Sequence, residues 1–320
     1  MKILEPQIIK KYLAPLTFNN KNSLNLQDDV YYDKRKKIII STDTYEEKIH
    51  FIGGDNPHNF LTKIFRSAIS DIYSKGCKPF TYFLNISINK ININWLRKFK
   101  DILKKESKLH SVFLGGGDTV RSKKLSISIT IVANVKTKPI LRSGAKINDD
   151  IYVTGTLGDS YVGLLCTLNK LKIGNLKKYF VKCFKTPLLN PKFSGELYRF
   201  ASSSIDISDG IVKDLKNLCS SSNKGAKLIY SKIPFSKNVL ILQKKNKINL
   251  MNIFSKGDDY QILFTASKKK RSLIKNISRF TKTKVSRVGL ITADKKVNIS
   301  KSGKIIDVST SKTGYIHEFS

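Results

Sequence analysis

The chain has 320 residues with 40% hydrophobic content, enough for two domains or one large domain with an ample core. Its apolar runs are shorter than the roughly 18–20 residues of a membrane-spanning helix, and its first residues lack an apolar stretch of signal-peptide length. These two features argue against an integral membrane protein and predict a cytoplasmic protein with no membrane partner. The formal net charge is +35.

The positive charge does not have the pattern of a nucleic-acid-binding surface. Lys accounts for 50 of the 59 basic residues and is spread over nearly every segment. Base readout favours Arg, and RNA-binding platforms interleave aromatic residues with the charge. We therefore expect no specific nucleic-acid partner.

Cysteine and histidine spacing argues against two further kinds of site. The four cysteines include no Cys-x-x-Cys pair, and the four histidines have no paired spacing. Neither a zinc site nor a disulfide framework is predicted.

In chain order, the first half alternates strands and helices. The apolar run 37–43 predicts a buried strand, and residues 58–75 have the apolar spacing of a helix that Gly76 is expected to end. Further elements are a strand at 80–88, a helix at 93–109, a short strand at 111–114 and a strictly alternating strand at 125–135. This order predicts an N-terminal domain, residues 1–137, with an antiparallel sheet and helices.

A connector at 136–148 leads to a second, C-terminal α/β domain, predicted to span residues 138–320. Its strands are expected at 151–154, 227–231, 261–265 and 285–291, and its helices at 160–171, 191–201, 210–220 and 269–281. The fold class predicted from the whole pattern is two-domain α/β (α+β).

The few acidic residues are gathered in short loops rich in Gly, Ser and Thr. Asp outnumbers Glu by 18 to 6, and the loops lie at 27–29, 41–44, 70–71, 115–118, 205–210 and 257–259. Short carboxylates on stiff loops suit Mg²⁺, which prefers oxygen ligands and retains waters and phosphate oxygens. Asp and Gly also mark turns and helix N-caps, so any single loop has this simpler explanation.

Two common catalytic motifs are missing from the chain. It has no Gly-x-x-x-x-Gly-Lys-Ser/Thr loop, so a nucleotide would have to bind without a Walker motif. It also has no Gly-x-Ser-x-Gly elbow that would indicate acyl transfer.

The order of the loops resembles one family over nearly the whole chain. The matching segments are Ser-Thr-Asp-Thr at 41–44, His-Phe at 50–51, Ser-Asp at 70–71, Gly-Gly-Asp-Thr at 116–119, Leu-Arg-Ser-Gly-Ala-Lys at 141–146, Ile-Asp-Ile-Ser-Asp-Gly at 205–210, Gly-Asp-Asp-Tyr at 257–260 and Gly-Tyr-Ile-His-Glu-Phe at 314–319. In these segments the chain resembles the thiamine-monophosphate kinases of the aminoimidazole-ribonucleotide-synthetase-like superfamily.

The resemblance implies ATP-dependent phosphorylation of thiamine phosphate to thiamine diphosphate, with several Mg²⁺ ions, in a homodimer paired through the N-terminal half. It assigns metal binding to Asp29, Ser41, Thr42, Asp43, Asp71, Asp118, Asp206 and Asp209. It assigns ATP binding to Gly117, Asp118, Arg142 and Ser208, and contact with the thiamine substrate to His50 and Asp258. It implies no catalytic residue separate from the metal ligands.

The residue types suit this chemistry independently of the resemblance. Joining two phosphates brings multiply charged anions together, so charge neutralisation and in-line positioning dominate the barrier. The acceptor phosphate has a second pKa near 6 and is largely ionised at neutral pH, so no general base is required. The guanidinium of Arg142 can bind a phosphate through two hydrogen bonds. Taken by itself, this residue could also be an ordinary surface arginine.

Several positions depart from the family pattern, and all bear on substrate affinity more than on metal binding. Gln27 and Lys256 replace glycines, and Asp258 stands where Glu is usual. Lys312 replaces an aromatic residue that often covers the substrate ring, and a cation there would repel the thiazolium.

Two other functions remain open from the sequence. One is another ATP-dependent enzyme of the same superfamily, acting on a different phosphorylated or small substrate. The other is a non-catalytic polyanion-binding protein on a degenerate enzyme scaffold, which would use the +35 charge.

Overall fold

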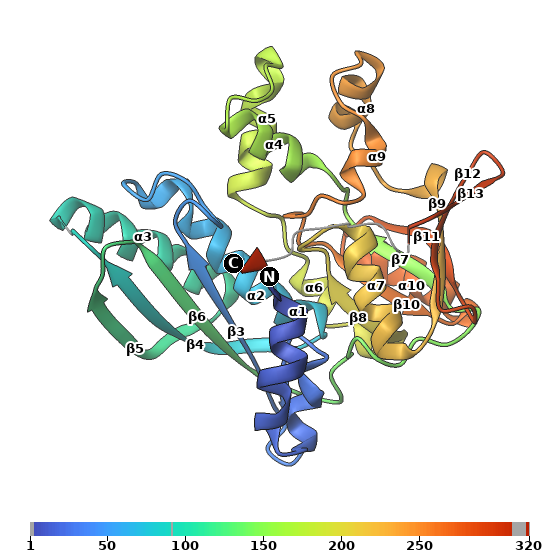
Figure 1. Ribbon diagram of the computed structural model, residues 1–320, viewed down its shortest axis with the longest axis horizontal. Coiled ribbons are helices and arrows are strands. Elements are labelled where there is room, and N and C mark those ends of the chain that lie inside the picture. The colour runs from blue at the N-terminus through green and yellow to red at the C-terminus, as the bar shows by residue number, and fades with distance from the viewer. Residues whose placement is uncertain (1–2, 91, 309–317, 320) are drawn as a thin grey trace.

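A computed structural model describes residues 3–90, 92–308 and the backbone of 318–319. The two halves of the chain form separate sheets, which lie on either side of helix α2, Leu61–Ser74 (Figure 1). The mixed α/β fold predicted from the sequence is confirmed. Lys312 and residues 314–317 of the C-terminal motif lie outside the described residues.

The helices and strands follow one another with short 3₁₀ or π-helical turns between several of them. The strands are β1 (Ile3–Leu4), β2 (Tyr31–Asp33), β3 (Ile38–Glu46), β4 (Lys78–Ile88), β5 (Phe113–Arg121), β6 (Ser126–Asn134), β7 (Asp150–Thr154), β8 (Ala201–Asp206), β9 (Gly225–Ile229), β10 (Ile262–Ala266), β11 (Val285–Thr292), β12 (Val297–Lys301), β13 (Lys304–Asp307) and β14 (Glu318–Phe319). The α-helices are α1 (Glu5–Ile8), α2 (Leu61–Ser74), α3 (Ile93–His110), α4 (Asp159–Thr167), α5 (Lys177–Lys185), α6 (Pro191–Ser194), α7 (Ile211–Ser222), α8 (Lys237–Lys244), α9 (Leu250–Ile253) and α10 (Arg271–Phe280).

The first half contains a five-stranded sheet with the order β2-β3-β6-β4-β5. The predicted alternation in β6 places Ile127 and Ile129 in the buried core, together with the apolar residues of α2. The opposite face carries Thr42, Phe83 and Asn85 and is exposed to solvent. Helices thus cover one face of this sheet and leave the other open.

One strand pair in this sheet is parallel, whereas its other pairs are antiparallel. Strand β4 pairs with β5 in the parallel direction because helix α3 carries the chain back before β5 begins. Strand β5 lies at the edge of the sheet, and the three glycines at 115–117 lie within it rather than in a loop after a shorter strand.

Helix α2 begins later than predicted and ends as predicted. A 3₁₀ turn at Pro57–Asn59 precedes it, and Lys75 caps its C-terminus. Gly76 follows with φ of +72°, a left-handed conformation that favours glycine. This ending places Lys75 at the junction between the two sheets.

The second half contains a seven-stranded sheet with the order β13-β12-β9-β11-β7-β10-β8. Strands β7, β10 and β11 coincide closely with the predicted strands, and all five residues of β7 are buried. Helix α7 packs on this sheet through Leu215 and Leu218 in a common core.

The predicted helix at 191–201 is wrong. Helix α6 ends at Ser194, and from Ala201 the chain forms strand β8. The serines of β8 gave the segment a polar sequence that did not indicate a buried strand. Their hydroxyl groups have partners inside the protein: the hydroxyl oxygens of Ser203 and of Thr265 in β10 lie 2.8 Å apart. Helices α5 and α8 are elements that the sequence reading missed.

The strands of the first sheet fall within residues 31–134 and those of the second within 150–307. We keep the division after residue 137 as a proposal for the domain boundary. Within the described ranges, the structure contains no helix of the length and apolar character needed to cross a membrane.

Candidate active site

A cavity of about 720 Å³ lies between the two halves of the chain. Loops after β8 and around 255–260 supply one side of it, and β3 and α2 supply the other. Ten of the residues predicted for the site line this cavity: Asp29, Thr42, Asp43, His50, Asp71, Arg142, Asp206, Ser208, Asp209 and Asp258.

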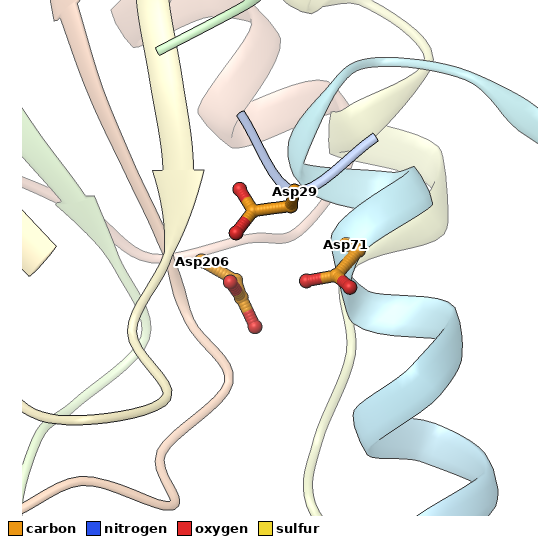
Figure 2. Close-up of side chains that lie close together, drawn as sticks. All are labelled: Asp29, Asp71 and Asp206. Carbon is orange, nitrogen blue, oxygen red and sulfur yellow. The ribbon is translucent and has the colours of Figure 1, made fainter. Parts of the chain in front are cut away.

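Three of these carboxylates form a compact group. Asp29 lies in the loop before β2, Asp71 lies late in α2, and Asp206 ends β8. One oxygen atom from each lies within 4.8 Å of the others, and Figure 2 shows the three side chains converging from their separate elements. The fold therefore brings together acidic residues that are far apart in the sequence.

Neighbouring hydroxyl groups orient the carboxylates. The Ser41 hydroxyl donates to Asp71 at 2.6 Å, and the Ser70 hydroxyl donates to Asp206. The Tyr45 hydroxyl donates to Asp43 at 3.0 Å. Ser41 is not among the residues that line the cavity, so in this structure it acts on the site through Asp71.

Crowding and burial change the protonation of these groups. Burial and the charge of Asp29 raise the pKa of Asp43 to about 6 and that of Asp206 to about 7. Burial and the charges of Asp43 and Asp206 raise the pKa of Asp71 well above its ordinary value. Without a bound cation, these carboxyl groups therefore keep their protons to a higher pH than they would in the unfolded chain.

Asp29 differs because two cations contact it. Arg142 donates to both of its oxygens, and the Lys75 ammonium lies 2.8 Å from Oδ2. Burial alone would raise the pKa of Asp29, but the charges of Arg142 and Lys75 lower it well below its ordinary range. Asp29 is therefore ionised in the metal-free protein.

The donor atoms of this acidic group fit a hard divalent cation. The three groups offer carboxylate oxygens alone, without sulfur or imidazole nitrogen. Mg²⁺ prefers such ligands and is usually held by one or two carboxylates together with phosphate oxygens and waters. The cavity leaves room beside the carboxylates for a triphosphate.

A second acidic pair lies at the start of α7. Asp209 is paired with Lys213 at 2.6 Å, and burial raises the pKa of Asp209. The backbone amides of Asp209 and Gly210 donate to the buried Asp214 at 3.1 and 3.0 Å. Asp214 thus holds the loop that carries Ser208 and Asp209, a role that the sequence reading missed.

Asp258 lies on the same side of the cavity as Ser208 and Asp209, and its carboxylate already has partners. Its carboxylate is 2.9 Å from the Lys63 ammonium and accepts from the Tyr260 hydroxyl at 3.0 Å. The preceding Gly257 is required by close packing, because a Cβ there would lie 1.8 Å from the carbonyl oxygen of Ser208. The two loops that carry Ser208 and Asp258 are therefore held together.

His50 lies in the bend that follows β3. The backbone amide of Glu46 donates to its Nδ1 at 3.0 Å, and its ring contacts the edge of the Tyr45 ring. Because Nδ1 accepts this hydrogen bond, the imidazole is held in one orientation at the cavity wall.

Gly117 and Asp118 lie elsewhere. Both belong to the edge strand β5, and Asp118 is exposed. The register runs from Asp43 through Ile129 and Leu84 to Gly117, so about 14 Å, or three strand spacings, separate β3 from β5. Within one chain the structure does not bring Asp118 to the other carboxylates.

Helix α2 carries a signal that the sequence reading overlooked. Lys63, Ser67, Asp71 and Lys75 follow one another at intervals of four and therefore share one face of the helix. Three of them line the cavity, and the fourth contacts Asp29. The four-residue spacing that Lys63 and Lys75 share with Asp71 is the signal in the sequence that would have indicated both lysines.

Comparison with known proteins agrees with this fold. Residues 27–135 match the family model described as AIR synthase related protein, N-terminal domain. The structure described as "AaThiL complexed with AMPPCP and TMP" has the same fold, with a TM-score of 0.82 at 23% identity, covering 98% of this chain and 97% of that one.

Curated relatives extend the match over most of the chain. The thiamine-monophosphate kinase of Buchnera aphidicola subsp. Acyrthosiphon pisum (strain APS) is 34% identical over 91% of this chain and 92% of its own length. The thiamine-monophosphate kinase of Escherichia coli (strain K12) is 31% identical over 82% of this chain and 81% of its own. The chain belongs to the thiamine-monophosphate kinase family.

Proposed function

We propose that this enzyme transfers the γ-phosphoryl group of ATP to thiamine phosphate, giving thiamine diphosphate and ADP. The observation that carries the proposal is the cavity between the two halves, which gathers ten of the predicted site residues around a group of three carboxylates. The family name and the AMPPCP and TMP named for a structure of the same fold support the same substrates.

We propose Mg²⁺ as the cofactor, held by Asp29, Asp71 and Asp206 together with Asp43 and Asp209. When bound, Mg²⁺ supplies the positive charge that brings the two phosphates together. Thr42 is among the residues that line the cavity, and Ser41 orients Asp71. The carboxylates have to be deprotonated to act as ligands, which requires Asp43 and Asp206 to give up the protons that burial favours.

We assign Arg142 and Ser208 to ATP. Arg142 contacts Asp29 in this structure and also lines the cavity, so it can exchange that carboxylate for a phosphate of the nucleotide. A guanidinium suits this exchange because its planar fork pairs equally well with carboxylate and phosphate.

We assign His50 and Asp258 to thiamine phosphate. The cationic thiazolium gives a carboxylate at position 258 a direct electrostatic role. In this structure Lys63 already neutralises that carboxylate, so the substrate cation has to compete with the Lys63 ammonium. Asp258 therefore contributes selectivity for a positively charged ring more than raw affinity.

We propose that the enzyme is a homodimer paired through the five-stranded sheet. Two observations support this: the sheet face with Thr42, Phe83 and Asn85 is exposed, and so are large apolar side chains of β5, with Phe113 61% accessible. Pairing through this face would place Gly117 and Asp118 beside a second chain. Their predicted roles in ATP and metal binding are therefore to be tested in the dimer. Sedimentation equilibrium of the wild type and of Phe83→Asp would show whether this face associates.

A direct assay tests the proposed reaction. Purified protein is incubated with ATP, Mg²⁺ and thiamine phosphate, and thiamine diphosphate is measured by chromatography. Unphosphorylated thiamine and a ribonucleotide serve as alternative acceptors. Phosphorylation of the ribonucleotide but not of thiamine phosphate would favour another activity of the superfamily.

We also propose a cytoplasmic location, where ATP is available.

A further inference from the structure

A fully buried lysine lies next to the acidic group and has no part in the reaction proposed above. Lys75 caps helix α2 and has no solvent-accessible surface. Its ammonium lies 2.8 Å from Asp28 Oδ1 and 2.8 Å from Asp29 Oδ2, and it donates to the carbonyl oxygen of Ser204 at 3.3 Å. Three acceptors match the three hydrogens of the ammonium.

The position of this charge separates it from the other cation at Asp29. Arg142 lines the cavity and can turn toward a ligand, whereas Lys75 is not among the residues lining the cavity. Lys75 is held from both halves of the chain, because Asp28 and Asp29 precede the first sheet and Ser204 belongs to β8. Its charge therefore stays beside Asp29 whether or not substrates are bound.

A permanent cation at this distance has two physical consequences. It neutralises the buried charge of Asp29 when no metal is bound, so the site can form empty. It also repels any divalent ion that approaches Asp29, which weakens metal binding.

We propose that Lys75 is a resident cation of the metal site, which holds Asp29 in place without metal and lowers the affinity of the acidic group for divalent ions. The inference rests on the proposed function, in which Asp29 is a metal ligand. It makes Lys75 a positioning residue, since it acts through Asp29 and not on the substrates.

Calorimetric titration with Mg²⁺ alone, on the nucleotide-free full chain, tests this role. Lys75→Met removes the charge and keeps the length of the side chain, and we expect it to bind Mg²⁺ about tenfold more tightly or better. Its melting temperature should fall in chelator and rise with Mg²⁺ by more than that of the wild type. Lys100→Met is the control for net charge, because its side chain is 71% exposed.

The double variant Lys75→Met/Asp28→Asn removes one positive and one negative charge together. Asp28 is not assigned as a metal ligand, so this variant should return to within about threefold of the wild-type Mg²⁺ affinity. It also covers the case in which Lys75→Met fails to fold, because folding rescued by the double variant would show that charge balance is what Lys75 provides.

The outcomes separate this inference from the proposed function. Equal or weaker Mg²⁺ binding by folded Lys75→Met, with the wild type binding normally, would overturn the role of Lys75 and leave the kinase proposal standing. Failure of both variants to fold, with or without Mg²⁺, would show a packing role and overturn it as well. Absence of Mg²⁺ binding in wild type and variant alike would remove the metal site itself.

Discussion

Replacement of one site carboxylate should make the metal-free protein more stable while it abolishes activity. Asp206 is 2% exposed, and burial together with the charge of Asp29 raises its pKa to about 7, against an ordinary value of 3.8. Asp206→Asn keeps the shape and can still accept the hydrogen bond from Ser70. The substitution removes a charge that the folded protein holds at a cost.

The size of the gain follows from the two pKa values. A difference of about three units corresponds to roughly 4 kcal/mol of folding free energy at pH 8, where the group is ionised in both states. Because the pKa of Asp206 is higher in the folded than in the unfolded protein, binding of a proton to Asp206 stabilises the folded protein. This stabilisation is fully present below pH 3.8 and is lost as the pH rises through 7. The advantage of Asn should therefore be absent at pH 3.5 and complete at pH 8, where we expect up to about 4 kcal/mol.

Thermal denaturation in chelator at several pH values measures the effect. At pH 8 we expect a melting temperature roughly 5–10 °C above that of the wild type. Asp150→Asn is a matched control with the opposite sign, because Arg271 and Arg287 contact the buried Asp150 and hold its pKa below the ordinary value. If Asp206→Asn were less stable than the wild type at pH 8, the electrostatic description of the acidic group would be wrong.

Four further outcomes follow from the site and from the charge of the whole chain. Chelator should abolish turnover and Mg²⁺ or Mn²⁺ restore it; full activity in excess chelator would exclude metal assistance. Asp43→Asn should lower the rate about 10²-fold with the fold retained, and Asp118→Asn should do the same if the proposed dimer brings Asp118 to the site; normal rates in steady-state assays would refute these ligand assignments. His50→Ala should raise the KM for thiamine phosphate and leave that for ATP nearly unchanged, while Asp258→Glu should be tolerated; a weakened ATP site would reverse the assignment. Binding to nucleic acid should be weak and fall steeply with salt, so sequence-selective binding at physiological salt in a filter assay would contradict it.

Strong periodicity made most of the fold predictable. The alternation in β6 and the apolar stripe of α2 come from local sequence, and both elements formed close to the predicted bounds. Strand β8 was not predicted, because the hydrogen-bond partners of its serine hydroxyl groups belong to other elements, as Thr265 does. Local polarity cannot report a partner that lies sixty residues away in the sequence.

The sequence predicted ten of the residues that line the cavity, but not the balance of charges among them. Short acidic loops indicated Asp71 and Asp206, but their distance depends on how α2 meets β8. Lys63 was overlooked because one lysine among 50 carries little information. Its significance comes from burial and from the contact with Asp258 at 2.9 Å.

The contrast among the three clustered carboxylates shows what the tertiary structure adds. Their oxygens lie within 4.8 Å, yet the pKa of Asp29 is lowered while those of Asp71 and Asp206 are raised. The difference arises from Lys75 and Arg142, which contact Asp29 alone of the three. One carboxylate is thus already ionised, and the other two have to release protons as a cation binds. Cation binding by the empty site should therefore strengthen as pH rises through about 7, with Asp206 and not Asp29 as a source of the protons.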